Sequence, residues 1–157
     1  MGASEKLAFI QPTAWAGQAL RGGAREVIEP ATGDVLASVA LASVEDVADA
    51  AAQAGRAQKT WAQIAPRERA AVFHRAAALF QQHFDELALY VTRETGAILP
   101  KGQHELREAA TFCHVAAAMP MQAQGQVLPS TPGRLSIARR VPLGVVGVIS
   151  PFNFPLI

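Results

Sequence analysis

Apolar residues recur every three or four positions through most of the first 120 residues, and this spacing is typical of amphipathic helices. It predicts a helix over residues 43–61 and a second helix that begins at Pro66. A third helix is expected over residues 85–95, and a fourth begins near Lys101. The first two thirds of the chain are therefore predicted to be mainly helical.

Individual residues mark the ends of these helices. Ser43, with Asp46 three positions later, has the pattern of a capping box. Proline fits the first position of a helix, as at Pro66, and glycine often follows the last turn, as at Gly96. Pro120 cannot donate a hydrogen bond to a helix, so we expect the fourth helix to kink or end there.

Two segments change from the helical period to residues that favour strands, and proline and glycine divide each segment. The first predicted hairpin pairs residues 27–28 with residues 35–39. The second pairs residues 126–128 with residues 135–141. Nothing in the sequence covers the faces of the second hairpin, so it is a candidate for pairing with another subunit or domain.

The last segment begins with an unbroken apolar run at residues 144–149, with the sequence GVVGVI. A β-branched run without alternation predicts a strand covered on both faces of a parallel sheet. Pro151 and Pro155 stiffen the turn that follows, and Asn153 lies between them. In open α/β folds, ligands bind at the carboxyl ends of the strands, where Asn153 is expected to lie.

Two interpretations of Asn153 remain open from spacing alone. Its side-chain amide could donate to an oxygen that gains negative charge in a transition state, without losing a proton. Asparagine also commonly caps turns, and the spacing by itself favours that role. The two glycines of residues 144–149 have G-x-x-G spacing, which is not the G-x-G-x-x-G fingerprint of dinucleotide binding.

Composition and charge exclude several classes of protein. The net charge is +1 with acidic and basic residues interspersed, which gives no electrostatic reason to expect nucleic acid or an anionic membrane as a partner. One cysteine among 157 residues excludes an internal disulfide framework and fits a reducing compartment. No secretory signal or membrane-spanning run is recognisable, so we expect a cytoplasmic protein.

The other reactive side chains give no strong candidate site. Cys113 lies in an alanine-rich helical stretch, and its neighbour His114 points about a quarter turn away, so a small buried thiol is expected. His104 and Glu108 can share a helix face, but without a third ligand we predict no metal site. Four further residues are expected to be scattered or surface charges: His74, His83, Arg93 and Lys101.

Residues 142–156, PLGVVGVISPFNFPL, closely resemble the strand-and-turn motif of the NAD(P)-dependent aldehyde dehydrogenases. The resemblance extends through most of the chain after residue 26. Shorter matches occur in the family's order at residues 29–37, 61–62, 66–70, 85–88 and 94–96. The terminal motif is highly specific, and the upstream pieces are persuasive together.

The resemblance implies a role for five residues. Asn153 matches the asparagine that stabilises the oxyanion, and Ile149, Ser150, Pro151 and Phe152 match the segment that lines the nicotinamide and ribose of NAD or NADP. Phe152 stands where tryptophan is common. With the Asn-Phe-Pro that follows, it resembles the branch that oxidises aromatic aldehydes such as benzaldehyde or vanillin.

The resemblance also implies the reaction, in which an aldehyde is oxidised to a carboxylic acid. A cysteine thiolate adds to the aldehyde, hydride passes to the nicotinamide, and the acyl-enzyme is hydrolysed. In the family, the nucleophilic cysteine and the general-base glutamate both follow the terminal motif. We therefore expect the isolated chain neither to turn over aldehyde nor to bind the cofactor tightly.

The expected fold class is α/β, an incomplete N-terminal part of the aldehyde dehydrogenase fold, with helices and hairpins leading into the first strand of a Rossmann-like sheet. The complete enzyme is expected to be a homo-oligomer, a dimer or a tetramer.

Two alternatives are a truncated chain without activity and a helical interaction module that binds a full-length partner through its hairpin. The expected parts are an irregular arm (1–25), a helical part of the cofactor domain with a first hairpin (26–125), a bridging or oligomerisation hairpin (126–141), and the first Rossmann-like strand with its oxyanion turn (142–157).

Overall fold

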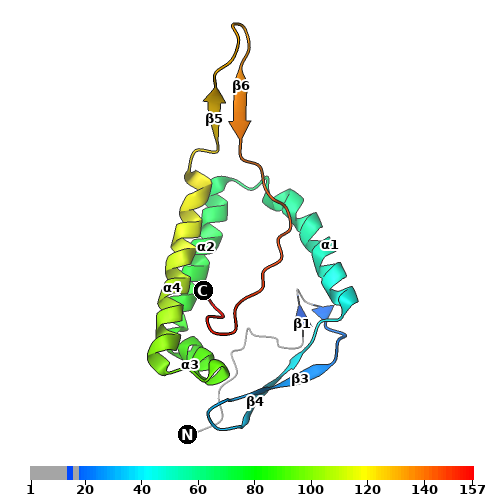
Figure 1. The fold of residues 1–157 in the computed structure, drawn as a ribbon, viewed down its shortest axis with the longest axis vertical. Helices are drawn as coiled ribbons and strands as arrows, with labels where there is room; N and C mark the ends of the chain where they lie inside the picture. Colours follow the sequence, from blue (N-terminus) through cyan, green and yellow to red (C-terminus); the bar gives the residue numbers. More distant parts are fainter. Residues whose placement is uncertain (1–13, 16–17) are drawn as a thin grey trace.

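The computed structural model describes residues 14–15 and 18–157, where helices and hairpins form an open frame (Figure 1). Helices α2 (Pro66–Gln82) and α4 (Leu99–Ala118) lie side by side along one side of the frame. Helix α1 (Val44–Trp61) lies on the opposite side, and α3 (Phe84–Thr95) packs under α4. None of the described helices is long and apolar enough to cross a lipid bilayer.

The capping signals of the sequence locate the helix ends. The Ser43 hydroxyl accepts a hydrogen bond from the Asp46 backbone N–H at 3.2 Å, and Asp46 accepts one from the Ser43 N–H at 2.8 Å, so the predicted capping box is confirmed. Pro66 occupies the first position of α2. Gly96 ends α3 in the left-handed conformation, with φ at 70°. The α-helix α4 stops before Pro120, in a short 3₁₀ turn over Met119–Met121.

The core of the described chain is small and built largely from alanine. Ala77 of α2 and Ala117 of α4 are buried, which lets these two helices approach closely. Ala88, Val91 and Leu106 form a buried cluster between α3 and α4, and three partly buried side chains pack against it: Phe80, Phe84 and Leu87. The frame is therefore held mainly by close helix contacts rather than by many large side chains.

Gly102 makes the closest of these contacts possible. A Cβ atom at this position would lie 2.7 Å from the Thr92 hydroxyl oxygen and even nearer the Ala88 carbonyl oxygen. Both of those residues belong to α3, whereas Gly102 belongs to the first part of α4. Because glycine has no side chain, α3 and α4 can approach closely near the beginning of α4.

Both predicted hairpins are confirmed as antiparallel pairs. One pairs β3 (Ala24–Ile28) with β4 (Val35–Ala40) and is tied to α3 by two hydrogen bonds from Arg93 to Glu29, at 2.8 and 3.1 Å. Arg93 is therefore not the simple surface charge that the sequence suggested. The other hairpin, β5 (Gly125–Leu128) with β6 (Ser136–Arg139), projects away from the frame (Figure 1).

The described part of the expected irregular arm contains regular pairing. Residues Ala14–Trp15 (β1) pair with Gln18–Ala19 (β2), and β3 already begins at Ala24. Residues 1–13 and 16–17, which belong to the same expected arm, lie outside the described residues.

The expected strand at residues 144–149 is not formed. This stretch runs from β6 through the space between α1 and the α2–α4 pair without strand pairing (Figure 1). A strand requires a hydrogen-bonded neighbour, and the three sheets of the described chain are separate two-stranded antiparallel pairs. Val148 and Ile149 are 84% and 97% exposed instead of buried. The parallel sheet is therefore absent from the described residues, and the strand stays a prediction for a fold that supplies its neighbours.

Candidate active site

The turn after residues 144–149 is fastened to the N-terminal half of α4. The Glu105 Oε2 atom accepts a hydrogen bond from the backbone N–H of Leu156 at 3.0 Å. The Lys101 Nζ atom lies 4.8 Å from the centre of the Phe154 ring, within the range of a cation–π contact. The chain end that carries Asn153 is thus held on its carboxyl side by two residues of one helix.

Lys101 and Glu105 are four residues apart on α4 and form an ion pair. The Lys101 Nζ and Glu105 Oε1 atoms are in contact, but their geometry does not meet the criteria for a hydrogen bond. Glu105 is completely buried, and the Lys101 side chain is only 20% exposed. Lys101 is therefore not the surface charge expected from the sequence, although the i, i+4 spacing of opposite charges was a signal that could have identified the pair.

Asn153 is exposed in this turn, between Pro151 and Pro155. Its side chain makes no hydrogen bond to any described residue, so it does not cap the turn in the way that asparagine often does. Both its amide N–H groups and its amide oxygen are available to a ligand. The geometry gives Asn153 a fixed backbone support and an unengaged amide.

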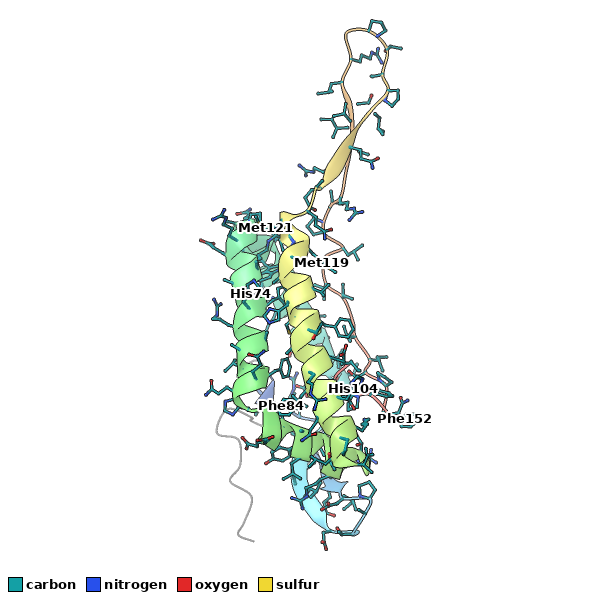
Figure 2. The ribbon with its side chains drawn as sticks, turned by 90° about the vertical axis from the view of Figure 1, so that its left-hand side faces the viewer. His74, Phe84, His104, Met119, Met121 and Phe152 are labelled. Carbon is teal, nitrogen blue, oxygen red and sulfur yellow. The ribbon has the colours of Figure 1, made fainter. Side chains whose placement is uncertain are left out.

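Residues Ile149, Ser150, Pro151 and Phe152 lead into the same turn and are all exposed. Figure 2 shows that the Phe152 side chain points away from the helices. Ile149 and Phe152 offer apolar surface, and the backbone of 149–152 makes no hydrogen bond within the described chain. The segment thus presents apolar surface and free backbone groups, and it carries no charged side chain.

Two histidines that are far apart in the sequence meet on the side of α4 that faces α2. The Nδ1 atoms of His74 on α2 and His114 on α4 are 3.1 Å apart, beside an open cavity of about 530 Å³. The sequence had placed His74 among scattered residues, because only the packing of α2 on α4 brings the two rings together. No group of three or more histidine, cysteine, aspartate or glutamate side chains that could hold a metal occurs among the described residues.

The remaining candidates are isolated. Cys113 is a half-buried free thiol on α4. His104 is exposed on the same helix, and no described ion pair joins it to Glu108 (Figure 2). Neither arrangement provides a second reactive group at the Asn153 turn.

Comparison with known proteins places this turn in a family context. The model of the aldehyde dehydrogenase family matches residues 16–157. A vanillin dehydrogenase from Amycolatopsis sp. is 49% identical over 158 residues, which cover 96% of this chain and 32% of that protein. The chain thus spans about a third of the length of this relative.

Solved structures show the same similarity. An NAD-dependent benzaldehyde dehydrogenase from Corynebacterium glutamicum superposes with a TM-score of 0.87 and 36% identity, over 95% of this chain and 34% of that chain. An NADP-dependent enzyme from E. coli gives a TM-score of 0.82 with 32% identity, over 86% of this chain and 28% of that one. The open frame therefore superposes on about a third of each of these solved chains.

Proposed function

Because the chain belongs to the aldehyde dehydrogenase family, we propose that it supplies the asparagine arm of an oxyanion hole and one wall of the nicotinamide pocket. The observation that carries this proposal is the terminal turn. Asn153 is exposed there with an unengaged amide, while the backbone after it is fastened to α4. A turn built only for structure would more simply use the asparagine side chain as its own cap.

The chemistry follows from the amide group. When a thiolate adds to an aldehyde, the carbonyl oxygen gains negative charge, and the Asn153 side-chain N–H groups would donate hydrogen bonds to it. The amide stays neutral and keeps its protons throughout, whereas an aspartate would repel the developing charge. NAD(P)+, when bound, supplies the hydride acceptor. Ile149, Ser150, Pro151 and Phe152 would line its nicotinamide and ribose.

The substrate we propose is an aromatic aldehyde, oxidised to its carboxylic acid in the cytoplasm. This part rests on relatives that are a vanillin and a benzaldehyde dehydrogenase, and on the exposed apolar ring of Phe152 directly before Asn153 in the chain. The thiol nucleophile and the general base are assigned to parts of the enzyme beyond this chain, since Cys113 lies on α4 without a catalytic partner. Either NAD or NADP remains compatible, because relatives use both.

The test requires a complete enzyme, which can be built from the Amycolatopsis vanillin dehydrogenase. This chain replaces the matching third of that protein, and NADH formation with vanillin and benzaldehyde is measured. We expect Asn153→Ala to lower kcat by about 10²- to 10³-fold, the usual loss when one oxyanion donor is removed. The KM for NAD+ should change little, because the amide is not needed to bind the cofactor.

Two controls sharpen this test. Asn153→Asp keeps the size of the side chain but places a negative charge at the oxyanion, and we expect a loss at least as large as with alanine. Equal losses in kcat and in NAD+ affinity for Asn153→Ala would contradict the oxyanion role. Steady turnover by the purified 157-residue chain alone would contradict the assignment of the nucleophile to another part of the enzyme.

The second candidate function is a non-catalytic interaction module, and the projecting hairpin favours it. Val127 of β5 and Ile137 of β6 face each other in register and are 72% and 58% exposed. In the complete enzyme we propose that the same hairpin joins subunits of a dimer or tetramer. Light scattering of the chain mixed with the Corynebacterium glutamicum enzyme tests the module, with a Val127→Asp/Ile137→Asp variant as the control.

A further inference from the structure

Glu105 is a buried carboxylate that the proposed reaction does not use. It is 0% exposed, yet it lies on a helix whose other buried side chains are Leu106 and several alanines. Removing a carboxylate from water costs several kcal/mol unless other groups compensate, and apolar residues often serve a core equally well. The position of Glu105 therefore calls for a role other than core packing.

Its two oxygens divide between two partners. Oε1 contacts the Lys101 ammonium on the same helix, and Oε2 accepts the Leu156 N–H. Pro155, the residue before Leu156, has no N–H of its own, so Leu156 offers the first backbone donor after Phe154. The second oxygen of Glu105 thus binds the backbone of the turn that carries Asn153.

Lys101 contacts the same turn by a different interaction. Its Nζ atom is near the face of the Phe154 ring, and Phe154 directly follows Asn153 in the chain. The ion pair consequently reaches residues one and three positions beyond Asn153. Pro151 restricts the backbone on the other side.

We propose that Lys101 and Glu105 are positioning residues for the Asn153 amide, and we call them the α4 clasp. This inference rests on the proposed oxyanion role of Asn153. An oxyanion donor must be held within a few tenths of an ångström of its working position, and a shift of about 1 Å can lower a rate about 10²-fold. The clasp supplies this restraint through one hydrogen bond and one cation–π contact, while the amide itself stays free.

The kinetic test uses the vanillin dehydrogenase chimera. Glu105→Leu removes the acceptor, and we expect kcat to fall about 10- to 100-fold with the KM for NAD+ nearly unchanged. Glu105→Gln keeps an oxygen that can accept the Leu156 N–H, and it should restore most of the rate. Glu108→Leu, on the same helix but without a contact to the turn, is the matched control and should leave kcat unchanged.

A double mutant separates positioning from general damage. If the clasp acts through Asn153, then adding Glu105→Leu to Asn153→Ala should lower kcat little further. Additive losses, a loss only in NAD+ affinity, or no rescue by glutamine would each overturn the proposal. If Glu105→Leu does not fold, Lys101→Met is used in the same cycle, since it keeps the apolar stem and removes the cation.

The isolated 157-residue chain gives a readout that does not depend on activity. Asn153 is the only asparagine, so labelling with ¹⁵N-asparagine gives one side-chain amide signal. We expect Glu105→Leu to shift this signal and to speed hydrogen exchange of the Leu156 amide at least about tenfold, the loss expected for one hydrogen bond. An unprotected Leu156 amide in the unsubstituted chain would overturn the clasp.

These outcomes distinguish the two proposals. If Asn153→Ala leaves kcat unchanged, the proposed oxyanion role of Asn153 is wrong. The positioning role of the α4 clasp is then wrong too, even if the Leu156 amide is protected from exchange. If Asn153→Ala lowers kcat but Glu105→Leu does not, only the clasp is wrong.

Discussion

Gly102 allows a quantitative test of how closely α3 and α4 approach each other. Alanine is a better helix former than glycine by about 1 kcal/mol, so Gly102→Ala would stabilise an unobstructed helix. The new Cβ would instead lie 2.7 Å from the Thr92 hydroxyl and nearer still to the Ala88 carbonyl, where real side-chain atoms do not fit. Overpacking of this kind costs about 1–3 kcal/mol, and a backbone carbonyl cannot rotate away. We expect a net loss of up to about 2 kcal/mol.

Gly55 of α1 is the matched control, because a Cβ there would meet nothing within 4 Å. Gly55→Ala should raise the free energy of unfolding by about 0.5–1 kcal/mol. For a chain of this size, the two variants should then differ in Tm by about 4–8 °C in thermal unfolding followed by circular dichroism. Equal stabilisation by both substitutions would refute the close approach of the two helices.

Two further substitutions test local features. Hydrogen bonds from the backbone N–H groups of Arg21 and Ser43 lower the pKa of Asp46. The Asp46 carboxylate therefore stabilises the fold fully above about pH 4, and this stabilisation is lost as the pH falls through the lowered pKa. Asp46→Asn should therefore be less stable than the unsubstituted chain at pH 6 but lose less stability towards pH 3, as measured by thermal unfolding; parallel pH profiles would contradict this. Gly96→Ala should destabilise by about 1–2 kcal/mol because its φ is 70°. Gly96→Ala should destabilise more than Gly33→Ala, although the φ of Gly33 is 80°, because a Cβ at Gly33 would meet nothing within 4 Å and one at Gly96 would lie 3.1 Å from Pro30 Cβ. A smaller loss for Gly96→Ala than for Gly33→Ala would count against the contact with Pro30.

Helix ends were predictable because their signals are local. Ser43 and Asp46, Pro66 and Gly96 act through bonds to residues within one turn, and each lies where the sequence places it. The position of Asn153 in a turn was predictable for the same reason, since the flanking prolines restrict their own backbone.

The long-range contacts were not predictable, because they join residues far apart in the chain. The Glu105–Leu156 bond spans 51 positions and the His74–His114 pair spans 40. Periodicity gives the apolar face of each helix but not which helix it packs on. The strand expected at 144–149 is not formed among the described residues for a related reason: its pattern describes burial between neighbours that these residues do not include.

The long span of the Glu105–Leu156 bond also leads to an expectation about the order in which the chain folds. Closing a loop of 51 residues costs about 3.5 kcal/mol of chain entropy, whereas one hydrogen bond and one cation–π contact return about 2 kcal/mol. The turn therefore cannot dock on a disordered α4. We expect helices α2, α3 and α4 to pack first, because α3 contacts α4 directly after it in the chain and α2 contacts α4 over shorter separations than 51 residues, and this packing shortens the loop to be closed. We therefore expect the turn at residues 151–156 to be the last described part of this chain to acquire its structure and the first to lose it on unfolding.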